Sequence, residues 1–258
     1  MKKILVAVLV CMLGGCASRS PDPAAYTPQT AENDLQARAR IHAELAAGYL
    51  ELGNYGVALQ EANEALKSDA NYVLAHNVLG LAYMELRDDK SAEASFQRAL
   101  RINAQDSDSN NNYGWFLCQR KREKESVKYF LDALRNPLYT TPEKSWVNAG
   151  ICARQSGDQK NAEDYFQRAI KLRPNQPQAL QNLADMAYSR RDFIGAKTYL
   201  SRVQRDAGSP SSAEFLWLAL RVERQLGDRN AEQSLAFQLQ KNFPESREAR
   251  ALAAGKFE

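Results

Sequence analysis

The sequence repeats itself with a period of about 34 residues, and this periodicity limits the fold more than any other feature. The copies lie at 45–72, 79–106, 113–140, 149–176 and 183–210, with a degenerate sixth at about 213–244. A period of this length is typical of helical repeats that stack on their neighbours, because one repeat cannot bury its apolar face alone. The chain is therefore predicted to be a solenoid.

The copies resemble the tetratricopeptide repeat, in which two antiparallel helices approach closely through small residues. The small and aromatic positions are filled by Gly80, Gly114 and Gly150 in the first helices, and by Ala58, Ala92, Ala162, Ala196, Phe96, Phe130 and Phe166 in the second. Pro174 and Pro244 stand where the second helix should end, because proline lacks a backbone donor. We expect an all-α chain, a right-handed superhelix of six tetratricopeptide repeats with a concave surface.

The amino terminus has a different composition from the repeats. Lys2 and Lys3 precede an apolar run at 4–13 that is too short to span a bilayer, which predicts a secretory signal peptide at 1–15. The sequence Leu-Gly-Gly-Cys ending at Cys16 resembles the bacterial lipobox, which implies cleavage before Cys16 and attachment of acyl chains such as palmitate. An ordinary cleaved signal with an incidental cysteine is the alternative.

A segment with three prolines and no apolar periodicity follows Cys16. It predicts a flexible tether at 16–38, ahead of a repeat domain at 39–258. Ala17 stands where an inner-membrane retention signal would carry Asp, so resemblance to enterobacterial sorting rules implies a lipid anchor in the outer membrane, facing the periplasm.

Charge and motif content argue against several function classes. A net charge of +3 is unlike the strong basic excess of a nucleic-acid binder. We find no phosphate loop, Ser/His/Asp group or metal-spaced Cys/His set, so no catalytic, cofactor-binding or metal residue and no small-molecule substrate is predicted. His42 and His76 share one repeat position, which favours packing over metal binding. The run Asp106-Ser107-Asp108-Ser109 lacks the Gly and terminal Glu of a calcium loop and is expected to cap the helix that begins the third repeat.

Cys118 and Cys152 lie on the first helices of repeats three and four, which should be neighbours in the stack. In an oxidising periplasm such a pair is a candidate disulfide, closing a loop that would contribute on the order of 3 kcal/mol. Bridging requires Cα atoms within about 7 Å, a distance that the sequence does not give, so two free thiols remain the alternative.

In tetratricopeptide proteins the first helix of each repeat lines the groove. The corresponding positions of the first four repeats form an apolar stripe flanked by polar residues, whereas repeat five is more polar. The predicted partner-binding residues are Ala47, Leu50, Leu81, Met84, Asn111, Trp115 and Ile151. An exposed apolar strip marks a partner site, with Trp115 as its expected hot spot and an apolar helix or strand as its ligand. Coverage of the strip by the amino-terminal segment or a crystal neighbour is the alternative.

Several features of the chain occur together: the lipobox, the tether, the six repeats and two segments, "NNYGWFLCQ" at 111–119 and "LYTTPEKSWVNAGICARQSGD" at 138–158. In this combination the chain resembles the PilF/PilW lipoproteins of type IV pilus biogenesis. The resemblance implies a non-enzymatic outer-membrane pilotin that binds the secretin PilQ, promotes its multimerisation and supports pilus biogenesis or fibre stability. A periplasmic scaffold for outer-membrane protein assembly or cell-wall synthesis is the alternative.

Overall fold

The computed structural model describes residues 33–205 and 212–257, which contain thirteen α-helices and no strand. The signal peptide, Cys16 and the tether up to residue 32 lie outside the described residues. The helices are α1 (Asp34–Glu51), α2 (Tyr55–Ser68), α3 (Val73–Glu85), α4 (Asp89–Ile102), α5 (Ser107–Gln119), α6 (Glu123–Ala133), α7 (Pro142–Gln155), α8 (Gln159–Leu172), α9 (Pro177–Ser189), α10 (Phe193–Arg205), α11 (Ala213–Leu226), α12 (Arg229–Asn242) and α13 (Arg247–Ala253).

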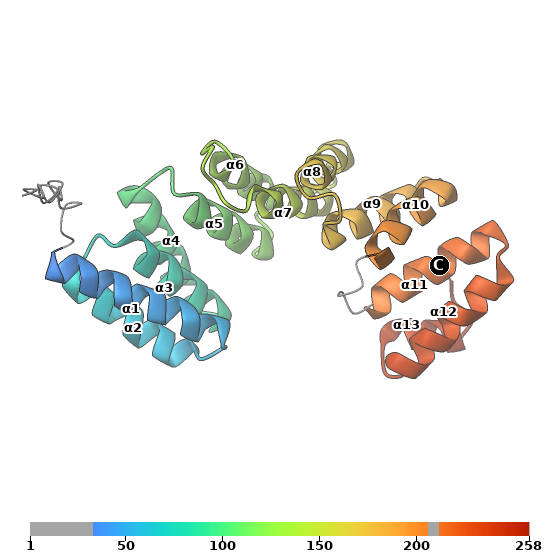
Figure 1. The fold of residues 1–258 in the computed structure, drawn as a ribbon, viewed down its shortest axis with the longest axis horizontal. Helices are drawn as coiled ribbons and strands as arrows, with labels where there is room; N and C mark the ends of the chain where they lie inside the picture. The colour runs from blue at the N-terminus through green and yellow to red at the C-terminus, as the bar shows by residue number, and fades with distance from the viewer. Residues whose placement is uncertain (1–32, 206–211, 258) are drawn as a thin grey trace, which may run out of the picture.

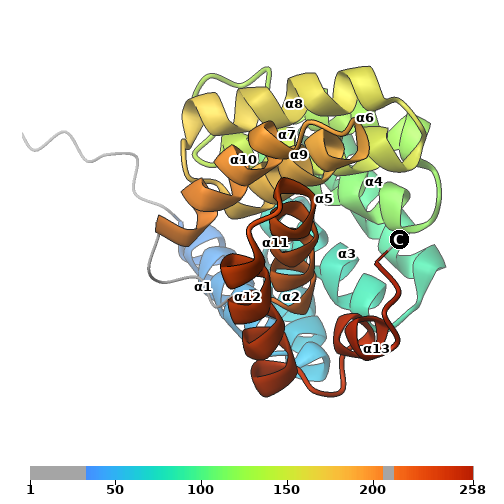
Figure 2. The ribbon, with the colours of Figure 1, turned by 90° about the vertical axis from the view of Figure 1, so that its right-hand side faces the viewer.

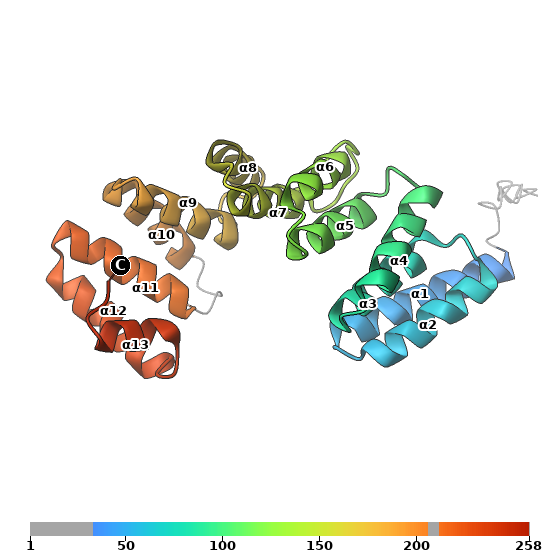
Figure 3. The same ribbon diagram turned by 180° about the vertical axis from the view of Figure 1, so that it is seen from behind.

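The helices pair along the chain, α1 with α2 through α11 with α12, so that each pair is one repeat. Successive odd-numbered helices also contact one another, whereas no two even-numbered helices do within the described residues. The odd helices therefore form an inner layer and the even helices an outer one. Figures 1 and 3 show the resulting arch, with the two ends bent toward the same side. The predicted solenoid of tetratricopeptide repeats is confirmed.

Three glycines set the spacing within the helix pairs of repeats two to four. A Cβ placed on Gly80 would lie 2.6 Å from the ring of Phe96, and one on Gly150 would lie 2.6 Å from Phe166. Both phenylalanines are fully buried. The first helix can approach its partner only because it has no side chain there, which explains the glycine and phenylalanine of the repeat pattern.

The repeat domain begins earlier than the predicted residue 39, because α1 starts at Asp34. Asn33 caps the helix: its side chain accepts a hydrogen bond from the Gln36 backbone N–H at 2.8 Å, and the Gln36 side chain accepts one from the Asn33 N–H. This reciprocal cap extends α1 by more than a turn beyond the apolar pattern that defines repeat one.

The thirteenth helix was not anticipated from the six-repeat pattern. The second helix of repeat six ends at Asn242, before Pro244, as expected. Ser246 then caps α13, whose Ala249 N–H donates to the serine Oγ at 3.0 Å. Helix α13 packs on α11 and α12, and Figure 2 shows these three helices from the carboxyl-terminal side.

Candidate binding surface

The six apolar members of the predicted set lie on four successive inner helices. We call these residues the apolar stripe: Ala47 and Leu50 on α1, Leu81 and Met84 on α3, Trp115 on α5 and Ile151 on α7. Each is half-buried, packing against the core cluster of its own repeat while leaving part of its surface open. Apolar surface that is held rigidly and left accessible is suited to binding another protein.

Asn111, the polar member of the predicted set, lies elsewhere. Its side chain is buried, with 9 % of its surface exposed. Its Oδ1 accepts hydrogen bonds from Ser145 Oγ at 2.9 Å and from Asn148 Nδ2 at 3.1 Å, both on α7. Because these contacts use its acceptor to join two repeats, Asn111 belongs to the stacking interface and the expectation that it faces a partner is corrected.

The two neighbouring asparagines have similar structural roles. Asn110 Nδ2 donates to the backbone carbonyls of Ala104 and Asp106, both at 2.9 Å, which fixes the turn before α5. Asn112 Nδ2 donates to Asn77 Oδ1 on α3 at 3.2 Å. The Asn-Asn-Asn run therefore ties α5 to the preceding loop, to repeat four and to repeat two. Asp106 caps α5 through a 2.8 Å bond from the Ser109 N–H, as expected.

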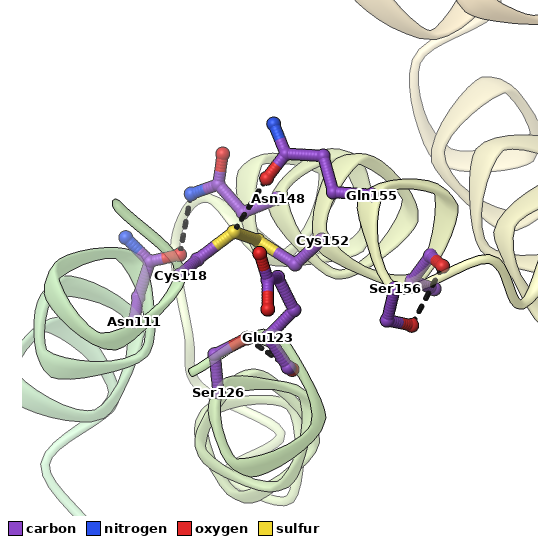
Figure 4. The surroundings of a disulfide bond; sticks show 9 residues. Asn111, Cys118, Glu123, Ser126, Asn148, Cys152, Gln155 and Ser156 are labelled. Carbon is purple, nitrogen blue, oxygen red and sulfur yellow. Dashed lines mark hydrogen bonds between the residues drawn. A yellow bond between two sulfur atoms is a disulfide. The ribbon is translucent and has the colours of Figure 1, made fainter. Parts of the chain in front are cut away.

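Cys118 and Cys152 form a disulfide between α5 and α7, with their Cα atoms 5.9 Å apart, inside the range that a bridge requires. Figure 4 shows the sulfurs between these helices and near α6. Both cysteines are buried beside Phe130 and Ala149, and Trp115 packs against this cluster. The disulfide therefore fixes the helix that carries the central tryptophan of the apolar stripe.

Tyr113 shows how α5 is held on its other side. Its hydroxyl donates to Glu93 Oε1 at 2.9 Å and accepts from Gln97 Nε2 at 3.2 Å. Burial raises the pKa of Tyr113 to about 12, and the Glu93 carboxylate adds to that rise. The tyrosine is thus neutral at physiological pH, and its hydroxyl connects α5 to α4 through hydrogen bonds rather than acting as a base.

Each of the two histidines has a hydrogen-bond partner in the structure. His42 Nδ1 lies 2.7 Å from Glu61 Oε2, and His76 Nε2 lies 3.1 Å from the Ala70 carbonyl. Burial lowers the pKa of His76, and the nearby Arg98 and Arg101 lower it further. Within the described parts of the chain, no group of His, Cys, Asp and Glu is arranged to hold a metal. No helix there is long and apolar enough to cross a membrane.

Comparison with known proteins agrees with this geometry. Two tetratricopeptide repeat models match residues 44–107 and 143–176. The type IV pilus assembly protein PilF of Pseudomonas aeruginosa is 27% identical over 98% of both chains. A crystal structure of PilW, a type IV pilus biogenesis factor, is 34% identical, covers 83% of this chain and 98% of its own, and superposes with a TM-score of 0.74.

The chain belongs to the PilF/PilW family of type IV pilus biogenesis proteins. The solved structure of Pseudomonas aeruginosa PilF supports the same assignment, with 27% identity, a TM-score of 0.80, and coverage of 86% of this chain and 99% of that one. This membership accounts for the repeats. It implies protein partners in the cell envelope, because a helical solenoid functions through its extended binding surface.

One apolar surface of this PilF/PilW-family chain was missed in the sequence. Ile41, Leu45 and Leu52 at α1 are 48%, 45% and 80% exposed. The repeat offset places Ile41 and Leu45 at the positions of Ala75 and Leu79, which are buried against repeat one. Repeat one has no described repeat before it, so its stacking face is open. Comparing the inter-repeat positions of the first copy with those of the second would have revealed this face.

The inner surface becomes charged beyond α7. Arg154 on α7 forms an ion pair with Asp185 on α9, and its other nitrogen donates to Asn182 Oδ1 at 3.0 Å. This pair stands where the apolar stripe ends at Ile151. The polar character expected of repeat five is therefore seen in the structure, and it begins at the junction between repeats four and five.

Proposed function

We propose that this protein is a lipid-anchored, non-enzymatic assembly factor that binds the secretin PilQ and promotes its multimerisation during pilus biogenesis. Family membership gives the pathway, and the apolar stripe on the inner helices of repeats one to four is the observation that carries the proposal. The predicted ligand is an apolar helix or strand of the secretin, because such a segment can bury its own apolar face against the stripe.

Trp115 is the proposed energetic centre of the stripe. It is half-buried on α5, and the disulfide cluster beneath it restricts its movement. A large aromatic side chain held in place loses little conformational entropy on binding, which is why tryptophan is enriched at hot spots. Leu81 and Met84 on α3 extend the same surface toward repeat one.

Membrane attachment completes the proposal. Cys16 would carry the lipid and the tether would hold the repeats near the outer membrane; Cys16 and the tether up to residue 32 lie outside the described residues. Confinement near the membrane raises the effective concentration of the stripe around secretin subunits and so favours their assembly. Labelling with radioactive palmitate checks the anchor. Failure to label, or label that persists in Cys16→Ser, would contradict it.

The decisive experiment is a secretin multimer gel from a deletion strain. The strain is complemented with wild type, Trp115→Ala, Leu81→Glu or the control Ile194→Glu. Ile194 is 74% exposed on the outer-layer helix α10, so its variant adds the same charge away from the stripe. We expect multimers to be lost with Leu81→Glu, reduced with Trp115→Ala and normal with Ile194→Glu.

Other outcomes reassign the function or the surface. Normal multimers in the deletion strain itself would reject the assembly role, and normal multimers with both stripe variants, at normal protein levels, would reject the stripe. Loss with Leu45→Glu alone would move the secretin contact to the open face of α1, where Leu45 is 45% exposed. Co-purification of a barrel-assembly or cell-wall complex instead of the secretin would place the protein in another envelope system.

A further inference from the structure

One side of the first repeat is apolar and uncovered in the described chain. Ile41 and Leu45 on α1 and Leu52 at its carboxyl-terminal cap are 48%, 45% and 80% exposed, and we call these three residues the open face. Their spacing of four and seven residues places them in one row along the helix. In repeats two to five the residue equivalent to Leu45 is packed between repeats, with at most 6% of its surface exposed: Leu79, Tyr113, Ala149 and Leu183. The open face is therefore a repeat junction without its covering half.

The polar residues beside the open face suit a lipid surface. Arg38 is exposed at the amino-terminal end of the row, and Tyr49 is half-buried between its last two members. Helices that lie at the lipid–water interface combine aliphatic side chains with arginine, which pairs with phosphate headgroups, and with tyrosine. Glu44 and Glu51 each precede a member of the row by one residue and therefore point about 100° away from it.

The open face also lies in the part of the repeat domain that is closest along the chain to the proposed lipid. Residues 17–32 separate Cys16 from Asn33, which caps α1. Even fully extended, a segment of this length reaches at most about 55 Å. Figure 1 shows α1 and α2 at the amino-terminal end of the arch. An anchor at Cys16 therefore holds this end of the arch, rather than the other, near the membrane.

The size of the open face argues against a second copy of the chain as its occupant. Its aliphatic side chains would bury on the order of 300 Å² per partner, whereas a stable protein interface buries about 800 Å² on each side. A lipid surface needs neither that area nor a complementary shape, because the acyl chains at Cys16 already supply the attachment. The open face then has only to orient a protein that is held there.

We infer that the open face lies on the phospholipid surface of the outer membrane, so that repeat one stands on the lipid and the later repeats extend away from it. This inference rests on the lipid anchor of the proposed function. It adds an orientation: the apolar stripe begins at Ala47 and Leu50 on the same helix, so it starts next to the lipid. A secretin segment bound along the stripe would be held beside the membrane in which the channel assembles.

The test places a fluorophore on the open face of the full-length lipidated protein, in vesicles of phosphatidylethanolamine and phosphatidylglycerol. Leu45→Cys is labelled with nitrobenzoxadiazole, and phospholipids with a nitroxide on the upper acyl chain quench a label that enters the bilayer. Selective labelling is possible because Cys118 and Cys152 form a disulfide and Cys16 would carry the lipid. The control label is on Leu86→Cys, which is 50% exposed and lies in repeat two. Flotation of the vesicles measures attachment separately.

We expect the label at residue 45 to lose about half of its emission, because an interfacial helix buries its apolar side about 5 to 10 Å deep. The label at residue 86 should be quenched much less, since the next packed helix lies about 8 to 10 Å farther from the lipid. Ile41→Glu should abolish the quenching at residue 45. Ile194→Glu, which adds the same charge at a 74% exposed site on α10, should leave it unchanged. Circular dichroism confirms that each variant is folded.

The remaining outcomes each contradict the inference. Equal quenching at residues 45 and 86, or no quenching at residue 45 in protein that floats with the vesicles, overturns it. Unquenched, blue-shifted emission that grows with the number of protein molecules per vesicle would assign the open face to a second copy instead. Protein that does not float contradicts the anchor, and this inference falls with it. Because no secretin takes part, loss of the membrane contact alone leaves the secretin proposal intact.

Discussion

The two halves of the inner surface are built from the same helix pair, yet they expose different chemistry. Repeats one to four carry Leu50, Leu81 and Trp115, whereas repeats five and six carry Asp185 and Arg221 at the surface. The buried small residues that bring the two helices of a pair together leave the inner surface free to vary. The comparison teaches that one solenoid can present two chemically unlike inner surfaces without a change of fold.

The halves also differ in how their helix pairs are spaced. Repeats two to four use a glycine facing a phenylalanine, as in Gly150 and Phe166. Repeat five uses Ala184 and Leu200 at the same positions, and both are buried. The disulfide lies only in the half with glycines. The amino-terminal half therefore depends on a closer fit, and the following changes test that dependence.

The largest expected effect comes from filling a glycine site. In Gly150→Val the new Cβ would lie 2.6 Å from the Phe166 ring, so the two helices must separate. We expect a loss of about 3 kcal/mol in the free energy of unfolding, measured by urea denaturation. The matched control is Gly48→Ala on α1, where a Cβ has no neighbour within 4 Å. It should stabilise the helix by about 0.5 to 1 kcal/mol. Equal effects would show that close packing does not distinguish the two sites.

Removing the disulfide should have the next largest effect. The Cys118→Ala, Cys152→Ala double variant opens a loop of sequence separation 34. We expect a loss of about 3 kcal/mol, because the unfolded chain regains its freedom. Urea denaturation with and without a reductant measures it. Wild type should lose stability in reductant and the double variant should not. A wild type unaffected by reductant would show that the bridge contributes nothing.

A smaller effect is expected at the junction of the halves. Asp185→Asn breaks the ion pair with Arg154, whose two side chains are 30% and 35% exposed. We expect a cost of about 1 kcal/mol in thermal unfolding. The comparison variant Asp164→Asn breaks the more exposed pair with Arg168 inside α8, at 51% exposure for both partners. Its cost should be about 0.3 kcal/mol. If Asp164→Asn cost as much, the junction would have no special role.

The smallest effect is a pH dependence from His76. Burial lowers the pKa of this histidine below its ordinary 6.5, so the unfolded chain binds a proton more readily than the folded one. Its contribution to stability is therefore complete above pH 6.5 and is lost as pH falls toward the folded-state value. His76→Gln should flatten the dependence of the urea midpoint on pH between 7.5 and 5. An unchanged slope would show that His76 does not titrate differently on folding.

Local pattern was enough to predict much of the fold. The helix pairs, the cap at Asp106 and the stop before Pro244 follow from side chains within a few residues of one another. Glycine and phenylalanine at fixed repeat positions predicted the close helix pairs. The candidate disulfide followed from the neighbour relation of repeats three and four. These features could be predicted from the sequence because each repeat contacts mainly the repeats next to it in the chain.

The binding surfaces were less predictable. The repeat pattern assigns Asn111 to the groove. In the structure its side chain accepts hydrogen bonds from Ser145 and Asn148 on α7 and therefore lies in the interface between repeats three and four. The open face of α1 was missed because Ile41 and Leu45 stand at positions that are buried between repeats in the later copies.

The sequence by itself determined the class of fold, the family and the boundary between apolar and polar inner helices, because these depend on residue type at a fixed period. The tertiary structure decided which side chains on those helices remain open. Trp115 stays accessible and Asn111 does not. Arg221 lacks a counter-ion among the described residues while Arg154 has one. The physical reason is that exposure and pairing depend on contacts between repeats, which side chains from distant positions make only after the helices have stacked.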